Sequence, residues 1–451
     1  MFKKFTNGCV ALVQKYLPDP FLFAIVLTIL VFVLGIITTG QGPLDMVIHW
    51  GNGVWSLLAF SMQMVLVLVT GHTLASAPIV KKGLNKLASI PKTPTQAIFA
   101  VSLISGIACW INWGFGLVIG ALYARELAKQ VKRVDYRLLI AAAYSGFLVW
   151  HGGISGSIPL SLATGGEALV TATKGAVTEA IPTTQTIFAP FNLIISAAII
   201  IMLPILNRAM HPKDEDAYVI DPKLLEDNME EATSVEKIMT PADKMENSPV
   251  LSMITGLLGL VYIIYYFATK GFDLNLNIVN LIFLIAGIIL HGTPRRYLNA
   301  LKEAVKGAGG IILQFPFYAG IMGMMTGESA AGVSLAGKMS EMFVAISNQT
   351  TYPLFTFLSA GLVNFFVPSG GGQWAVQAPI MMPAGLELGV NPAITGMAIA
   401  WGDAWTNMIQ PFWALPALGI AGLGARDIMG YCLIDLIVSG IIICLGLLLL
   451  V

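Results

Sequence analysis

Long apolar segments follow one another along most of this chain, and they constrain its fold more than any other feature. Each is roughly 20 residues long, which is the length that a helix needs to cross the hydrocarbon core of a bilayer. Hydrophobic residues make up 56% of the sequence and charged residues 11%, whereas soluble domains carry about 25% charged residues. The sequence therefore predicts an all-α polytopic membrane protein. We expect about nine transmembrane helices, near residues 20–39, 53–78, 138–163, 185–206, 250–269, 275–291, 307–327, 394–424 and 429–451.

Charge and cysteine content exclude several classes of function. Basic and acidic residues number 25 each, so the net charge is zero and nothing indicates a nucleic-acid partner. The four cysteines, Cys9, Cys109, Cys432 and Cys444, are scattered and match neither a metal site nor a disulfide framework. Because no pairing of a nucleophile with a base is apparent either, we expect no enzyme and no cofactor beyond a coupling ion.

Basic residues predict the orientation of the chain, because Lys and Arg concentrate on cytoplasmic loops. The apolar segment 95–124 has a basic cluster on each side, and its centre, INWGFG, is broken by glycine. A re-entrant hairpin that enters and leaves from the cytoplasm keeps both clusters inside; a bent single span is the alternative. With the hairpin, the N-terminus is also cytoplasmic.

A second apolar segment, 353–386, contains PSGGGQ at its centre. Non-helical backbone at membrane depth is tolerated only where protein buries it or where it lines a water-filled cavity. We therefore expect another re-entrant hairpin. Two spans are interrupted in a similar way, by WHGGISGS at 150–157 and by WGDAWTNMIQP at 401–411.

Four segments of the first half have counterparts in the same order in the second half. VTGHTLASAP corresponds to MTGESAAGV, and each is followed by an amphipathic stretch. SGIACWINWGFG then corresponds to SAGLVNFFVPSGGG, and GFLVWHGGISGSIPL corresponds to AIAWGDAWTNMIQPF. A lone span, 250–269, separates the halves and inverts the second, so its hairpin enters from outside. Inverted repeats typify secondary transporters, which bind substrate near the midplane on discontinuous helices.

The predicted organisation has three parts. Residues 1–206 form the first repeat, with four spans and the cytoplasmic-side hairpin 95–124. Residues 207–274 form a cytoplasmic loop and the linking span. Residues 275–451 form the second, inverted repeat, with four spans and the outside-entering hairpin 353–386.

The four breaks carry the chemistry that an anion and a coupling cation need. Glycines let backbone N–H groups approach a carboxylate, and helix N-termini add a positive dipole end. Freed carbonyls, with Asn, Ser and Thr oxygens, can coordinate Na⁺. No Arg or Lys lies within a span to bind a carboxylate, which favours a small monocarboxylate over a di- or tricarboxylate.

For two intramembrane residues, a functional and a structural interpretation are both open. Asp403 is an ionisable group inside a span, which is a functional-site hypothesis by default. It either binds Na⁺ or a proton, or it accepts backbone N–H groups of the break. His151 either handles a proton or is a satisfied core imidazole. Asp435 lies in an apolar helix without a glycine break, and we expect it to be structural or interfacial.

The glycines and tryptophans at the breaks also allow two interpretations. Gly152, Gly153 and Gly156 either expose backbone to a ligand or permit close helix packing. Trp150 and Trp401 occupy matching positions and form either pocket walls or part of an interfacial belt.

Three stretches resemble the bacterial short-chain fatty acid transporter family, which is associated with acetoacetate and butyrate uptake. They are VNFFVPSGGGQWAVQAPIMMPA, AIAWGDAWTNMIQPFWALPALGIAG and INWGFGLVIGALYAREL, and the resemblance covers nearly the whole chain. The family is grouped in the ion-transporter superfamily, beside divalent-anion/sodium symporters. The resemblance implies a bacterial inner-membrane homodimer in which a transport domain with two hairpins moves against a scaffold as an elevator.

The resemblance also implies roles for individual residues. The hairpin tips and broken helices together give the candidate substrate-binding residues Asn112, Trp113, Gly114, Gly116, Trp150, His151, Ser155, Ser157, Asn364, Ser369, Gly370, Gly371, Gly372, Gln373, Trp401, Asp403, Thr406 and Asn407. A coupling Na⁺ would bind at Asn112, Asn364, Asp403 and Asn407. The Ser-Asn-Thr tips of dicarboxylate relatives are absent, so their sodium sites and two-carboxylate pocket are not transferred. Trp113, Trp374, Trp401 and Trp405 suggest an apolar wall for a short alkyl chain instead.

These observations favour a secondary active transporter that moves small monocarboxylates, such as butyrate or acetoacetate, with H⁺ or Na⁺. The alternative is a cation/proton exchanger of the same architecture that uses Asp403 and His151, although few other buried carboxylates are expected. A channel needs no matched inverted hairpins, and a membrane-embedded enzyme would need a catalytic pair. Chain length of the substrate, the coupling ion and the direction of flux stay open at this point.

Overall fold

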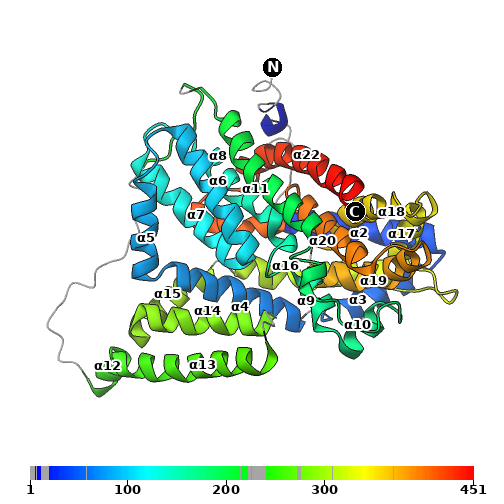
Figure 1. The fold of residues 1–451 in the computed structure, drawn as a ribbon, viewed down its shortest axis with the longest axis horizontal. Helices are drawn as coiled ribbons and strands as arrows, with labels where there is room; N and C mark the ends of the chain where they lie inside the picture. The colour runs from blue at the N-terminus through cyan, green and yellow to red at the C-terminus, as the bar shows by residue number, and fades with distance from the viewer. Residues whose placement is uncertain are drawn as a thin grey trace.

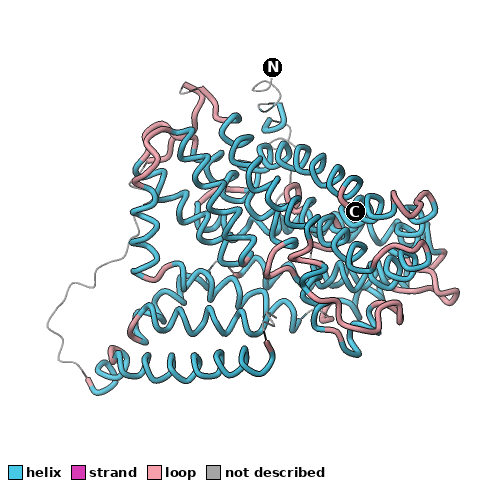
Figure 2. Tube along the Cα trace, viewed as in Figure 1, coloured by secondary structure: helices cyan, strands magenta, loops and turns pink. Residues whose placement is uncertain are grey.

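The chain is helical throughout the part that the computed structural model describes, and no strand occurs in that part (Figure 2). The described residues are 6, 8–11, 20–56, 58–213, 215–221, 225, 240–271, 276–306, 308–368 and 370–451. The helices are α2 (Pro20–Thr39), α3 (Pro43–Gly53), α4 (Leu58–Ala75), α5 (Pro78–Ala88), α6 (Pro94–Ile111), α7 (Trp113–Gln130), α8 (Tyr136–Ser145), η1 (Gly146–Gly152), α9 (Ser157–Thr164), α10 (Gly166–Ala172), η2 (Thr183–Gln185), α11 (Pro190–Met210), α12 (Pro241–Glu246), α13 (Pro249–Lys270), α14 (Leu276–His291), α15 (Pro294–Lys306), α16 (Gly309–Thr326), α17 (Leu335–Ala345), α18 (Tyr352–Asn364), α19 (Gly370–Glu387), α20 (Pro392–Thr406), η4 (Pro411–Ala414), α21 (Leu415–Ala421) and α22 (Ala425–Leu449).

Several of these helices are long and apolar enough to cross a membrane, which confirms the predicted fold class. Within the described residues the crossing-length helices are α6, the segment Tyr136–Thr164, α11, α13 and α22, and a bent pair formed by α4 and α5 would add a sixth. The prediction of about nine crossings exceeds this number, because the apolar stretches found within α2 (Ala24–Thr39) and α14 (Asn277–His291) are shorter and the segment after α20 is interrupted.

Both predicted hairpins consist of two helices joined at a short tip. α6 and α7 are separated by Asn112 alone and pack side by side (Figure 1). α18 and α19 are separated by residues 365–369, of which Ser369 lies outside the described part of the chain. α6 is itself long enough to span, so helix length does not distinguish a hairpin arm from a crossing.

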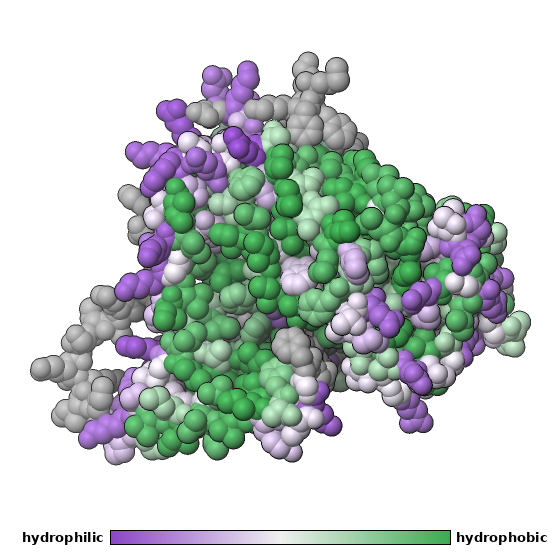
Figure 3. All heavy atoms as spheres, in the orientation of Figure 1, coloured by the Kyte–Doolittle hydropathy of each residue, from purple (hydrophilic) through white to green (hydrophobic). Residues whose placement is uncertain are grey.

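The surface has the polarity of a membrane protein. Apolar residues cover the face over α11, α22 and α13, and hydrophilic residues gather at the upper left and right edges of the view (Figure 3). α13 packs against α14 at the lower edge of Figure 1, and only 11% of its apolar window is buried. Because water would penalise so much exposed apolar surface, this helix belongs in lipid.

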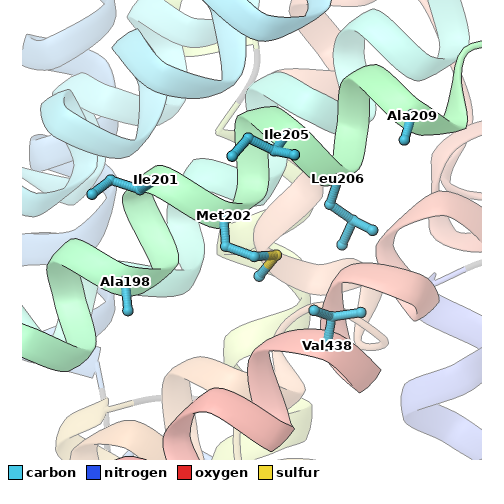
Figure 4. Close-up of a pocket in the computed structure, with 7 residues that line it drawn as sticks. All are labelled: Ala198, Ile201, Met202, Ile205, Leu206, Ala209 and Val438. Atoms are coloured by element: carbon cyan, nitrogen blue, oxygen red, sulfur yellow. The ribbon is translucent and has the colours of Figure 1, made fainter.

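An apolar groove runs between α11 and α22 on this surface. It has a volume of about 400 Å³ and is lined by Ala198, Ile201, Met202, Ile205, Leu206, Ala209 and Val438 (Figure 4). Its lining has no charged or hydrogen-bonding side chain, so it fits hydrocarbon better than a carboxylate. An anion-binding site is therefore expected in the interior instead.

Helix α3 is a short element between the predicted spans 20–39 and 53–78, where no helix was predicted. It packs against α16 through glycines on both helices. A Cβ atom on Gly53 would lie 2.5 Å from the carbonyl oxygen of Ala319 and 2.8 Å from the Cα atom of Gly323. The two backbones therefore approach too closely for any side chain at this position.

Gly53→Val should lower the free energy of unfolding by about 1–3 kcal/mol, because overpacking forces the helices apart. The matched control is Gly51→Val in the same helix, where a Cβ atom meets nothing within 4 Å. Thermal unfolding of the purified protein in detergent measures both. Equal losses in the two variants would show that helix propensity, rather than the contact between α3 and α16, causes the effect.

Candidate functional site

The first interrupted span supplies one side of the site. α8 passes into the 3₁₀ helix η1, and α9 begins only at Ser157. The backbone of Gly153 lies against the carbonyl group of Trp110, so a side chain there would collide with the tip of the α6–α7 hairpin. The N–H group of Ile154 donates to the Trp110 carbonyl oxygen at 2.8 Å. The hairpin tip thus accepts a backbone donor that the break has freed.

Two polar residues complete this first junction. The N–H group of Trp113 donates to Ser155 Oγ at 2.9 Å. Asn112 ends α6 and caps α7, because its Oδ1 accepts the N–H group of Phe115 at 3.0 Å. Gly114 and Gly116 lie buried in the first turn of α7. These predicted site residues hold the first tip against the first break.

The second interrupted span has a similar junction with the other hairpin. Asn364, at the end of α18, directs Nδ2 toward the carbonyl oxygen of Asp403 at 2.8 Å. The same nitrogen lies 2.9 Å from Thr406 Oγ1 and 3.0 Å from Asn407 Oδ1. Four predicted residues therefore meet at the C-terminal end of α20.

The two junctions are joined by a hydrogen bond between His151 and Asp403. His151 Nδ1 lies 2.6 Å from Asp403 Oδ2, and both side chains are fully buried. On the other side of the ring, Nε2 lies 3.0 Å from the N–H group of Ile158 and 3.0 Å from Ser157 Oγ. A backbone N–H can only donate, so Nε2 accepts and the ring proton sits on Nδ1.

This tautomer makes Asp403 the acceptor of the His151 proton. Its carboxylate therefore contacts the imidazole through Oδ2, and Oδ1 has no hydrogen-bond partner among the described residues. Asn364 Oδ1 is also buried without a partner in that part of the chain. Asp403 Oδ1 is thus able to receive a proton, and both oxygens are able to coordinate a cation, at the centre of the molecule.

The N-terminus of α19 reaches the same centre. A Cβ atom on Gly370 would collide with Ser157 Oγ and lie 2.8 Å from His151 Cε1. Gly370, Gly371 and Gly372 form the first turn of α19, whose N–H groups are not used within the helix. A helix N-terminus favours negative charge, so this turn suits a carboxylate.

Aromatic rings enclose one side of the pair. The Trp150 ring stacks on His151 with centroids 3.9 Å apart. The ring centroid of Trp113 lies 6.0 Å from that of Trp150 and 5.2 Å from that of Trp413. The Phe147 ring stacks on Trp150 with centroids 5.4 Å apart. We call Trp113, Phe147, Trp150 and Trp413 the aromatic cluster.

The other predicted tryptophans lie in different surroundings. Trp401 is fully buried, and its indole N–H donates to Asn192 Oδ1 at 3.0 Å. Trp405 donates to the Leu436 carbonyl oxygen at 2.7 Å, and Trp374 belongs to a separate core cluster. Trp150 and Trp401 are therefore both interior residues rather than members of an exposed belt.

Gln373 lies further from the centre than the glycines before it. Its Nε2 donates to the Ala360 carbonyl oxygen at 2.9 Å and to Gln377 Oε1 at 2.7 Å. These bonds connect α19 with α18 rather than with the broken helices. The predicted Na⁺ ligands are divided in a similar way, because Asn364, Asp403 and Asn407 come together whereas Asn112 belongs to the first tip.

Sequence reasoning missed several residues that support the site. Asn192 on α11 donates to the Gly152 carbonyl oxygen at 2.8 Å, and the Tyr144 hydroxyl donates to the Asn407 carbonyl oxygen at 2.8 Å. The available signal was a polar group in an otherwise apolar span, as in FNLIISAA around Asn192. Trp413 carried no such signal, because an aromatic residue in an apolar run is ordinary.

Comparison with known proteins places this chain in a family. The family model described as short chain fatty acid transporter matches residues 1–450. The chain belongs to the short-chain fatty acid transporter family. Membership confirms the resemblance carried by the sequence motifs, and it agrees with the expectation that this membrane protein is a transporter rather than an enzyme.

Similar proteins share this description. One from Escherichia coli strain K12, provisionally named as a short-chain fatty acid transporter, is 48% identical over 96% of this chain and 97% of its own length. One from Haemophilus influenzae, named in the same way, is 45% identical over 99% of each chain. The solved YdaH transporter of Alcanivorax borkumensis is similar at 18% identity with a TM-score of 0.48, over 96% of this chain and 97% of that one. That likeness is too distant to transfer any site to this chain.

Gly370→Ala should impair this transporter, because the added methyl group displaces His151 or Ser157. The expected outcome is lower substrate affinity together with a loss of about 1–3 kcal/mol in unfolding free energy. Gly419→Ala is the control, since a Cβ atom there meets nothing within 4 Å. Substrate binding and thermal unfolding are measured on both variants. Wild-type affinity in Gly370→Ala would contradict the placement of the α19 N-terminus at the site.

Proposed function

We propose that this protein is a secondary active transporter that carries small monocarboxylates, such as butyrate or acetoacetate, together with a proton bound at Asp403. The observation that carries the proposal is the buried pair of His151 Nδ1 and Asp403 Oδ2, 2.6 Å apart at the junction of two interrupted helices. A site with one ionisable carboxyl group and a helix N-terminus can hold one proton beside one anion.

The substrate carboxylate is assigned to the N-terminal turn of α19. Gly370, Gly371 and Gly372 offer backbone N–H groups there, and the Ser157 hydroxyl lies beside them. The aromatic cluster lies next to the same turn, because a Cβ atom on Gly370 would be 2.9 Å from the Trp150 ring. A short alkyl chain would therefore contact Trp150 and its aromatic neighbours while the carboxylate faces backbone donors.

Charge balance explains why proton and substrate would travel together. Carrying a carboxylate through a low-dielectric interior without a partner is costly. If Asp403 is ionised, it repels the substrate carboxylate; if Oδ1 has taken a proton from water, the site holds only the charge of the substrate. His151 keeps its proton on Nδ1 in both cases, since Ile158 N–H occupies Nε2. A second substrate carboxylate would add another negative charge to this site, which supports a monocarboxylate.

The proposed movement follows from the expected architecture. The two halves act as inverted repeats, 1–206 and 275–451, with 207–274 between them, and each contributes a re-entrant hairpin. The two tips and the two breaks meet at one centre, which supports a transport domain that moves as a unit. The elevator movement, the homodimer and the bacterial inner membrane, with the N-terminus cytoplasmic, complete the proposal.

Counterflow in proteoliposomes tests the substrate class. Labelled butyrate and acetoacetate should exchange, whereas a dicarboxylate should not. An imposed pH gradient should drive accumulation without Na⁺. Absence of monocarboxylate counterflow by folded protein would refute the function. A strict Na⁺ requirement would instead favour a cation at Asp403 Oδ1 and Asn364 Oδ1, and cation exchange without substrate would favour the exchanger.

Asp403→Asn should abolish accumulation driven by a pH gradient while leaving counterflow measurable. The amide retains an oxygen that accepts the His151 proton, but it cannot itself take up a proton. Glu341→Gln, at an exposed ion pair on α17, serves as the control and should accumulate substrate normally. Accumulation at the wild-type level in Asp403→Asn would rule out this residue as the coupling group.

A further inference from the structure

Asp435 is a buried carboxyl group that the proposed site does not use. It lies in the middle of α22, and the side chain is completely inaccessible to solvent. Neither carboxyl oxygen has a hydrogen-bond partner within the described part of the chain. The sequence suggested a structural or interfacial residue here, but a structural carboxyl group accepts hydrogen bonds and an interfacial one reaches water.

Among the described residues, the elements packed against α22 bring no buried positive charge to Asp435. The elements packed against α22 carry the titratable groups Tyr136, Arg137 and Tyr144 on α8, Arg208 on α11, Tyr352 on α18 and Asp403 on α20. Arg137 pairs with Asp427, Arg208 is exposed, and Asp403 contacts His151. Cys432, one turn earlier on α22, and Tyr144 on α8 are both fully buried.

Thiols and phenols are uncharged near neutral pH, so neither Cys432 nor Tyr144 can balance a negative charge. An ionised carboxylate without a partner is too costly to bury. Asp435 therefore carries a proton in this arrangement of the helices.

The position of Asp435 is tied to the broken helix α20. Trp405, two residues after Asp403, donates its indole N–H to the carbonyl oxygen of Leu436 at 2.7 Å. The same ring lies against Gly440, where a Cβ atom would be 2.8 Å from Trp405 Nε1. Any displacement of α20 along α22 must break this contact beside Asp435. Movement of α20 relative to α22 would therefore disturb the packing one residue away from Asp435.

We propose that Asp435 is a second proton-binding site of the transport cycle. Its carboxyl group holds a proton while α20 and α22 are packed together. When the helices move apart, the O–H bond breaks, the proton passes to water, and the solvated carboxylate remains. This inference rests on the proposed function, and it predicts two protons for each monocarboxylate, one at Asp403 and one at Asp435.

Asp435→Asn tests the proposal, because the amide keeps the shape and neutrality of the protonated group but cannot release a proton. Two protons with one anion carry a net positive charge, so wild-type uptake in proteoliposomes should respond to membrane potential. Uptake by Asp435→Asn should be electroneutral. Its steady-state accumulation should also be about tenfold lower for each pH unit of imposed gradient, because one proton is lost from the coupling.

Cys432→Ala, on the same face of α22, is the control and should behave as wild type. Unchanged voltage response and accumulation in Asp435→Asn would overturn the proposal, as would a changed Na⁺ dependence. If Asp435→Asn loses counterflow, Asp435→Glu replaces it; a shifted pH dependence of accumulation then supports the proposal and an unchanged one overturns it.

An infrared measurement separates this inference from the proposed function. Wild-type protein at neutral pH should show a protonated carboxyl band that Asp435→Asn lacks, whichever substrate is transported. If wild type fails to accumulate any monocarboxylate but the band is present, the proposed function fails while proton binding at Asp435 stands. Absence of the band from folded wild-type protein overturns proton binding at Asp435.

Discussion

The hydrogen bond between His151 and Asp403 joins two interrupted helices whose residues lie 252 positions apart in the chain. The rest of the centre keeps this bond buried and oriented. Ile158 N–H fixes the imidazole tautomer, and a glycine at position 370 leaves room for the ring. Such breaks are permitted at membrane depth because protein groups accept the freed backbone donors and carbonyls. Here the hairpin tips take that role, through the Trp110 carbonyl oxygen and the Asn364 amide.

An anion held at this centre would be held by dipoles rather than by a fixed cation. Backbone N–H groups at the start of a helix bind a carboxylate without introducing a permanent charge. A site built in this way has little net charge when empty, so moving it across a membrane is less costly than moving an unpaired arginine. The absence of Arg and Lys from the predicted spans, which favoured a small monocarboxylate, is thus also consistent with a site that moves.

The sequence located the individual parts of this centre but not their partners. Glycines and polar residues inside apolar runs marked INWGFG, PSGGGQ and both interrupted spans, because such residues conflict with a simple membrane helix. The bond from His151 to Asp403, however, connects residues far apart in the chain, and no local pattern encodes that pairing. Asn112 illustrates the same limit: its polarity suggested a ligand, whereas its oxygen caps α7. The sequence predicted a structural or interfacial role for Asp435, because the lack of partners around a carboxyl group is visible only in three dimensions.

Unlike the helices of the candidate site, the linking helix α13 is mostly exposed at the surface of the protein. It has 22 residues and is therefore about 33 Å long, close to the thickness of the hydrocarbon core, yet protein buries little of it. Its main contact is α14, against which Gly256 and Gly259 pack, so its tilt depends on that contact together with the match between its apolar length and the bilayer. Bilayer thickness would consequently act first on this connection between the two halves, and lipid composition becomes a variable of the transporter rather than a passive background.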